Sequence, residues 1–246
     1  MTDDVDVDAA ASAGTDTDAG ADADALYQLL AGNTAHVESL PESYFDGVLD
    51  EQHPAVASVC CSDSRVPQEG MWNVDRPGWL FTPSTIGNQA WDRVDGERVV
   101  DGSVLYPLAY TGTDVVAVVG HTGCGAVAAA LAAARGGTDH PPGVAKRVDL
   151  LVPVVEEGLA RADPDHPAGL VNQLVEHNVD RQVAFLRERA EVPDGVTAYG
   201  FVYDFQGAYG DTPGRAYLVN AAGETDPAAL RDRVPEAFTD HVRRLA

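Results

Sequence analysis

The sequence predicts an α/β protein: a mainly parallel β-sheet flanked by helices on both faces, with an N-terminal helical arm. Residues 55–61 and 115–119 are apolar and rich in valine, the composition of strands buried on both faces. The alanine-rich run 126–134 follows the second strand as a helix would, and it ends at Gly136-Gly137, a common helix stop. Strands that alternate with such helices favour a parallel sheet covered on both sides.

The other elements follow from the same patterns along the chain. Leu26, Leu29 and Leu30 have helical spacing up to Gly32-Asn33 and predict the arm. Pro107 is expected to kink the helix at 102–111 or to mark its first turn, and Pro153 is expected to interrupt the segment 144–159. The remaining expected elements are a strand at 79–81, helices at 102–111, 144–159 and 168–189, strands at 196–203 and 215–219, and a C-terminal helix at 227–245.

The charge balance limits the possible partners. The 246 residues include 39 acidic and 16 basic side chains, for a net charge of −23. Nucleic acids and anionic membranes are negative themselves, so we expect neither as a partner. Lys146 is the only lysine, and an acidic surface with almost no lysine indicates adaptation to high salt, which screens repulsion between carboxylates. An ordinary acidic soluble protein is the duller alternative.

The chain is expected to hold one domain behind a tail. Residues 1–25 alternate Asp with small residues and offer too little apolar area to offset their ordering entropy, so we expect a disordered acidic tail. Residues 26–246 form the single domain. No signal peptide or membrane span is recognisable. Three cysteines, two of them adjacent, suit a reducing compartment, so a cytoplasmic location is expected.

Potential metal ligands follow both buried strands. His121 and Cys124 come just after the second strand, and Cys60-Cys61 end the first. If the two strands are parallel neighbours, their carboxyl ends meet, and one of these cysteines reaches the same ion as His121 and Cys124. Two thiolates and one imidazole suit zinc, and three protein ligands with an open fourth position are typical of catalytic sites. A loop histidine beside a buried thiol is the simpler interpretation of either motif alone.

Two separated motifs then resemble the β-class carbonic anhydrases: Cys61-Ser62-Asp63-Ser64-Arg65 and His121-Thr122-Gly123-Cys124. Gly87-Asn88 and Gly200-Phe-Val-Tyr-Asp204 match the family as well, and the resemblance covers roughly residues 26 to 220. It implies Cys61, His121 and Cys124 as the ligands of Zn²⁺, with Asp63 and Arg65 as a catalytic pair beside them. Cys60 matches no ligand position, and it should face the other side of the sheet because neighbouring strand residues point opposite ways.

The resemblance also implies an activity and an assembly. The activity is the zinc-dependent, reversible hydration of carbon dioxide to bicarbonate and a proton, and the assembly is a homodimer or higher homo-oligomer in which the helical arm packs on a partner. The chain departs from the family at Ser84-Thr85, where an Arg-Asn pair is usual. Two alternatives therefore stay open: a carbon disulfide or carbonyl sulfide hydrolase on the same scaffold, and a non-catalytic zinc-binding homologue with a closed pocket.

Overall fold

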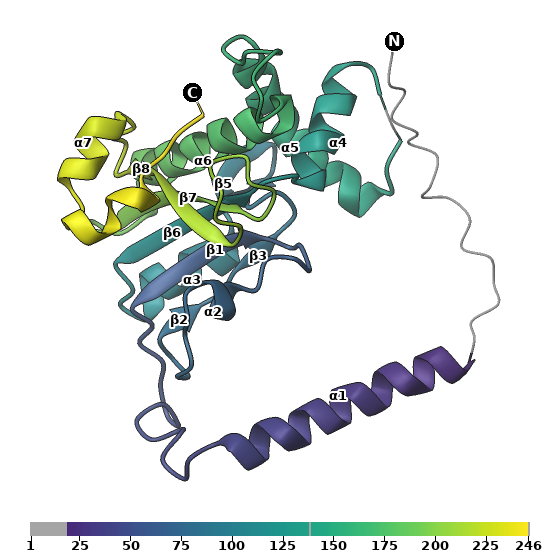
Figure 1. Cartoon of the computed structure of the whole chain (residues 1–246), viewed down its shortest axis with the longest axis vertical. Coiled ribbons are helices and arrows are strands. Elements are labelled where there is room, and N and C mark those ends of the chain that lie inside the picture. Colours follow the sequence, from purple (N-terminus) through teal and green to yellow (C-terminus); the bar gives the residue numbers. More distant parts are fainter. Residues whose placement is uncertain (1–18, 138, 246) are drawn as a thin grey trace. The chain divides into compact units, whose positions relative to one another are not determined.

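The structure is a computed structural model that describes residues 19–137 and 139–245, so residues 1–18 of the expected acidic tail lie outside the described residues. The chain divides into two compact units, with the boundary between Asp46 and Gly47. The helices and strands (Figure 1) are α1 (Ala19–Ser39), β1 (Val56–Cys61), α2 (Gln68–Met71), β2 (Leu80–Phe81), β3 (Ser84–Thr85), β4 (Trp91–Val94), β5 (Glu97–Val100), α3 (Gly102–Tyr110), β6 (Val115–His121), α4 (Gly125–Ala134), α5 (Pro142–Leu159), α6 (Leu170–Glu188), β7 (Thr197–Asp204), β8 (Arg215–Ala221), α7 (Pro227–Asp232) and the 3₁₀ helix η1 (Glu236–His241).

The first unit contains the expected helical arm. Helix α1 begins at Ala19, before the expected start near Ala25, and alanines in its first turns favour this extension. Its apolar side chains lack cover within the unit: Leu26, Leu29 and Leu30 are 53%, 73% and 58% exposed. An apolar helix face of this kind normally packs against another element.

The second unit is built on the predicted mainly parallel sheet. Its strand order is β2-β1-β6-β7-β8. Both β2 and β3 pair with β1, β2 near the start of β1 and β3 at its carboxyl end. The pairs among β2, β1, β6 and β7 are parallel, and only β8 runs antiparallel to its neighbour β7. The carboxyl ends of β1 and β6 therefore lie side by side at one edge of the sheet (Figure 1). This edge carries the candidate site.

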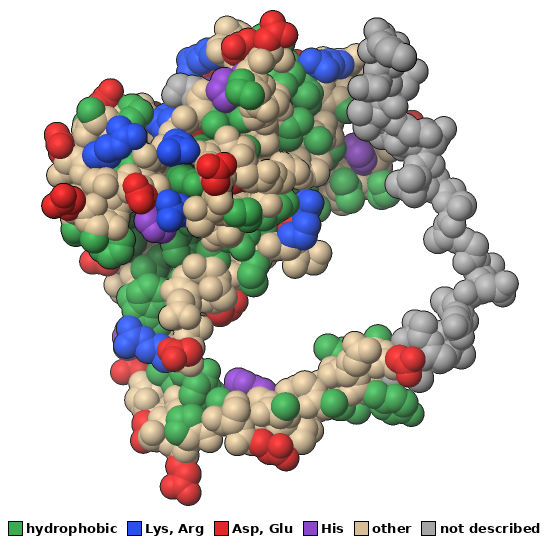
Figure 2. Space-filling model, in the orientation of Figure 1, with side chains coloured by type: hydrophobic (Ala, Val, Ile, Leu, Met, Phe, Trp, Pro, Cys, Tyr) green, Lys and Arg blue, Asp and Glu red, His purple; other side chains and the backbone are tan. Residues whose placement is uncertain are grey.

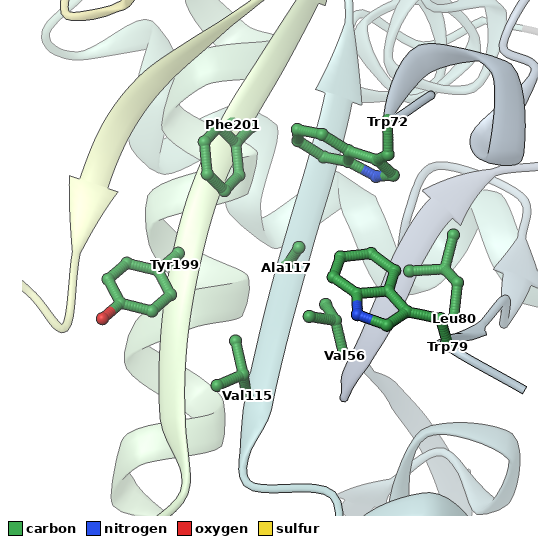
Figure 3. Close-up of a pocket in the computed structure, with 8 residues that line it drawn as sticks. All are labelled: Val56, Trp72, Trp79, Leu80, Val115, Ala117, Tyr199 and Phe201. Carbon is green, nitrogen blue, oxygen red and sulfur yellow. The ribbon is translucent and has the colours of Figure 1, made fainter. Parts of the chain in front are cut away.

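The two faces of the sheet are covered unequally. On one face, valines of β1, β6 and β7 pack with buried side chains of α3, α4, α5 and α6 in the main core. On the other face, α2 and the chain after it pack at one end, and α7 and Val242, the residue after η1, pack at the other. Between them lies an apolar pocket of about 180 Å³, with Trp72 and Trp79 on one side of Ala117 and Phe201 and Tyr199 on the other (Figure 3). Its lining is completed by Val56, Leu80 and Val115.

Two expectations about elements need correction, and one element was not expected. The C-terminal helix is not continuous to Leu245, because α7 ends at Asp232 and Pro235 precedes the short η1. Pro153 does not interrupt α5, since it lies on the exposed side, where water can satisfy the carbonyl that loses its partner. The hairpin formed by β4 and β5 was not predicted.

The acidic side chains are dispersed over the surface. Asp and Glu side chains are spread over the visible face and do not gather into one patch (Figure 2). Within the described residues, no helix combines the length and apolar composition that a bilayer crossing requires. The surface thus agrees with the charge balance of the sequence.

Candidate metal centre

Three predicted ligands come together where β1 and β6 end. Cys61 is the last residue of β1, His121 is the last residue of β6, and Cys124 precedes the first turn of α4. One ligand atom from each of the three lies within 4.8 Å of the others, and the Cys61 and Cys124 sulfurs are 3.9 Å apart. All three side chains are buried. The structure therefore brings together the Cys-His-Cys set that the sequence predicts.

The arrangement fits a tetrahedral metal ion. Two thiolates on one zinc ion with bonds of about 2.3 Å lie about 3.8 Å apart, close to the observed separation. His121 Nδ1 is 3.0 Å from the Thr122 carbonyl oxygen, so Nδ1 carries the proton and donates it there. His121 Nε2 is buried and has no hydrogen-bond partner. An unpartnered ring nitrogen close to two thiols is a donor set that could hold a metal ion.

The hydrogen bond between the two thiols shifts their pKa values in opposite directions. A hydrogen bond from the Cys124 thiol lowers the pKa of Cys61, and the Gly87 N–H, 3.3 Å from the Cys61 sulfur, adds to the effect. The same pairing raises the pKa of Cys124, and so does its burial. Two adjacent thiolates repel each other unless a cation lies between them. A metal ion bound here would therefore release protons from the thiols.

Cys60 lies away from this cluster, as expected. Its side chain is fully buried in the core on the opposite face of the sheet, with its sulfur 3.5 Å from the Ser58 hydroxyl. Burial raises the pKa of Cys60 to about 12. Cys60 is thus a neutral, packed thiol.

Two glycines, one near the end of β6 and one in the loop that follows, allow close packing at the end of this strand. A Cβ on Gly120 would lie 2.8 Å from side-chain carbons of both Val175 and Val179, so this glycine lets α6 pack directly on the end of β6. Gly123 has a φ of +65°, and its N–H donates to Asn172 Oδ1 over 2.8 Å. Helix α6 thereby fixes the peptide just before Cys124. The sequence analysis assigned no role to Asn172.

Asp63 and Arg65 form the predicted pair. Arg65 Nε and Nη2 donate to the two Asp63 carboxylate oxygens over 2.8 and 2.7 Å, and the Arg65 backbone N–H donates to the same carboxylate. The guanidinium holds the pKa of Asp63 well below its usual range. Asp63 Oδ2 is 3.5 Å from His121 Nε2, so the carboxylate faces the ligand cluster directly.

A second carboxylate organises the chain after β7. Asp204 is fully buried and accepts hydrogen bonds from the Thr122 hydroxyl and from the N–H groups of Gln206, Ala208 and Tyr209. Asp204 belongs to the 200–204 motif, to which the sequence analysis gave no function. Its contacts join the chain after β7 to Thr122, the neighbour of His121.

The departure at Ser84-Thr85 is accommodated locally. Ser84 Oγ accepts a hydrogen bond from Gln68 Nε2 over 2.9 Å, and the Thr85 hydroxyl donates to the Gln89 carbonyl over 3.1 Å. The segment still delivers the Gly87 N–H to Cys61. The altered pair therefore leaves this contact to the ligand cluster in place.

Comparison with known proteins places this arrangement in a family. A family model described as carbonic anhydrase matches residues 56–209, which include all five predicted site residues. The chain has the fold of the β-carbonic anhydrase CcaA, with a TM-score of 0.64 at 19% identity over 80% of this chain and 88% of that one. The chain belongs to the β-class carbonic anhydrase family. This is a family of lyases, and the carbonic anhydrase of Pseudomonas aeruginosa is 31% identical over 167 residues, which are 66% of this chain and 74% of the relative.

A third similarity also concerns the fold. Two tetrameric β-carbonic anhydrases from the ascomycete Sordaria macrospora were solved together, and the match to them has a TM-score of 0.57 at 21% identity. It covers 82% of this β-class chain and 96% of the fungal one. The comparison confirms the predicted fold.

Proposed function

We propose that this β-class family member catalyses the zinc-dependent, reversible hydration of carbon dioxide to bicarbonate and a proton. The observation that carries the proposal is the Cys61–His121–Cys124 cluster with the Asp63 carboxylate facing it from 3.5 Å. When bound, Zn²⁺ supplies a charge that lowers the pKa of a coordinated water to about 7. Cys61, His121 and Cys124 would hold the ion, and the chemistry it would supply is the activation of this water.

The residues around the cluster have separate tasks in this proposal. Cys61, His121 and Cys124 hold the ion, and the hydrogen bond from Nδ1 to the Thr122 carbonyl keeps Nε2 of His121 available as a ligand. The Gly87 N–H stabilises negative charge on the Cys61 sulfur. Both contacts fix the ligands before the ion arrives, so little reorganisation accompanies binding.

Asp63 orients the attacking oxygen and does not act as the proton acceptor. Its pKa is held well below the usual range by Arg65, so its carboxylate stays ionised and is a poor base near neutral pH. An ionised, fixed carboxylate accepts the hydrogen bond of the attacking oxygen and leaves an oxygen lone pair directed at the carbon of carbon dioxide. The proton passes to buffer.

Stopped-flow carbon dioxide hydration tests the proposal, with the zinc content measured on the same sample in concentrated salt. Activity with about one zinc per chain is the expected result. Stoichiometric zinc without hydration would contradict it. Hydrolysis of carbon disulfide or carbonyl sulfide by that sample would then identify the sulfur hydrolase, and inactivity on all three substrates would indicate the non-catalytic homologue.

We also infer that the protein is a homo-oligomer with the dimer as its minimal unit. Leu26, Leu29 and Leu30 of α1 are more than half exposed, and the second unit has an apolar pocket on its less covered sheet face (Figure 3). Both surfaces gain from burial against another copy. The tetrameric fungal relatives support this inference.

Sedimentation of the full chain measures the assembly. We expect the wild type to sediment as a dimer or larger species, and a Leu29→Glu, Leu30→Glu double variant to dissociate towards monomer. Val94→Glu places a charge on another exposed apolar residue, in the β4–β5 hairpin, and serves as the control. A monomeric wild type would contradict the inference.

The cellular setting is part of the proposal. All three cysteines are free, and the two in the cluster must stay reduced to act as ligands. We therefore place the protein in the cytoplasm, in cells with high internal salt. We expect neither nucleic acid nor membrane to bind it, because its net charge of −23 repels both.

A further inference from the structure

Phe205, just after β7, lies against two parts of the candidate site at once. Its ring stacks on the His121 imidazole, with 5.8 Å between the centroids and 23° between the planes. The Arg65 guanidinium carbon is 4.8 Å from the centroid of the same ring, in the geometry of a cation–π contact. One aromatic side chain thus touches both a predicted ligand and the partner of Asp63.

The position of Phe205 is set by a rigid backbone. Its N–H donates to the Thr122 hydroxyl over 3.2 Å, and that hydroxyl donates to Asp204 Oδ1 over 3.2 Å. Thr122 in turn donates its own N–H to the Tyr203 carbonyl over 3.1 Å. These bonds tie Phe205 to the residue next to His121, so the ring has a fixed place beside the cluster.

Arg65 needs such a support more than Asp63 does. The Arg65 side chain is 51% exposed and the Asp63 side chain 16%, so the arginine is the mobile member of the pair. Apart from Asp63, the contacts that hold its guanidinium among the described residues are the Gly123 carbonyl, 3.3 Å from Nη2, and the Phe205 ring. Loss of the ring leaves one side of the guanidinium open to solvent.

The position of Asp63 shows why the pair matters. Ligand atoms with bonds of about 2.0–2.1 Å to a tetrahedral ion lie about 3.3–3.4 Å apart. Asp63 Oδ2 is 3.5 Å from His121 Nε2, and the same oxygen accepts the 2.7 Å hydrogen bond from Arg65. A carboxylate at that distance can itself become the fourth ligand once its guanidinium leaves.

We propose that Phe205 is a positioning residue, which keeps Arg65 on Asp63 and so reserves the fourth ligand position for water and substrate. The inference rests on the proposed function only in requiring a metal on Cys61, His121 and Cys124. Phe205 acts through Arg65. A substitution of Phe205 therefore changes access to the fourth ligand position only while residue 63 carries a carboxylate. A ring that merely covers the site would act regardless of that carboxylate.

The test measures azide binding to the cobalt-substituted, full-length protein at one salt concentration. Visible absorption of the cobalt site reports the binding. Azide needs the position that a displaced Asp63 would occupy. Phe205→Ala is expected to weaken azide binding about two- to fivefold, the range of an exposed cation–π contact. Phe205→Tyr retains the ring and is expected to bind as the wild type does. Phe205→Leu retains bulk without a π face, so it gives a second measurement if the alanine variant folds poorly.

The deciding comparison is a double-mutant cycle with Asp63→Asn. In the Asp63→Asn background, Phe205→Ala is expected to leave azide affinity unchanged. An equal loss in both backgrounds would overturn the positioning role, as would an alanine variant with wild-type affinity. Phe185→Ala is the matched control, because Phe185 also lies under an arginine, with the Arg189 guanidinium carbon 5.2 Å from its ring centroid, but belongs to α6 away from the cluster.

Failure of the function and failure of this inference give different results. Cobalt binding and the azide cycle do not depend on turnover, so they can succeed in a protein that hydrates no carbon dioxide. Hydration without the expected coupling between Phe205 and Asp63 would remove the inference alone. A chain that binds no cobalt would remove both.

Discussion

The backbone N–H of Gly87 donates a hydrogen bond to Sγ of Cys61 over 3.3 Å. This contact joins the segment after β3 to the end of β1, and it requires Gly87 to adopt a φ of +77°. A Cβ at this position would lie 2.6 Å from Leu151 Cδ1. Backbone conformation and side-chain packing therefore both restrict this position to glycine.

Gly87→Ala is expected to weaken metal binding and lower the free energy of unfolding. The positive φ alone costs roughly 1 to 2 kcal/mol for a residue with a Cβ, and a displaced N–H costs about 10- to 100-fold in metal affinity. Chelator competition and thermal unfolding measure the two effects. Gly96→Ala is the matched control, since Gly96 has a φ of +85° with open space around it, and it should lose stability without losing metal.

Cys124→Ala is expected to abolish stoichiometric zinc, because it removes one of the three ligands of the proposed site. Cys60→Ala should retain about one zinc per chain, since Cys60 packs on the opposite face of the sheet. Metal analysis of both purified variants checks this. Zinc retained in the Cys124 variant, or lost in the Cys60 variant, would mean that the ligands are wrongly assigned.

Asp63→Ala is expected to retain zinc and to lose about 10- to 100-fold in hydration rate, because the attacking oxygen loses its orienting acceptor. Asp92→Ala is the control, since it removes another carboxylate that pairs with basic side chains, Lys146 and Arg147, outside the site. Stopped-flow rates at equal zinc content separate the two variants. Full activity in the Asp63→Ala variant would contradict the role of this carboxylate in orienting the attacking oxygen.

His177 gives the protein a predictable dependence on pH. Burial lowers the pKa of His177 from its ordinary value of 6.5. Its buried Nε2 has no hydrogen-bond partner. The unfolded chain therefore binds the proton more tightly, and this residue costs stability as the pH falls below about 6.5 towards the lower folded-state pKa.

His177→Gln is expected to reduce the loss of unfolding free energy between about pH 7.5 and about pH 5.5. The metal ligands and the carboxylates other than Glu157, whose Oε2 is 3.9 Å from His177 Nε2, titrate equally in both proteins, so the difference between wild type and variant isolates His177 with this neighbour. Urea unfolding at the two pH values provides the measurement. An unchanged pH dependence would show that His177 is not buried as the structure places it.

Salt is expected to stabilise the protein strongly. Raising KCl from about 0.1 M to about 3 M shortens the screening length and weakens repulsion among surface carboxylates. The thermal midpoint should rise, and the carbonic anhydrase of Pseudomonas aeruginosa, measured alongside, should respond less. Equal responses of the two proteins would remove the case for salt adaptation.

The sequence predicts the centre of the molecule better than its periphery. Cys61 and His121 end two valine-rich strands, and parallel neighbours place such ends together, so their proximity is readable from pattern alone. The β4–β5 hairpin also had a signal, Asp95-Gly96, both with positive φ, which the sequence analysis overlooked. No sequence signal indicated the role of Phe205, because its partners Arg65 and His121 are distant in the chain.

The chain positions of the ligands constrain how the protein folds. Cys61 and Cys124 are 63 residues apart, and strands β1 and β6 must pair before their sulfurs meet. The closure of so long a loop makes this contact slow to form. The complete metal site therefore arises late in folding. Zinc is expected to slow unfolding more than it speeds folding, so that loss of the ion shortens the lifetime of the native protein.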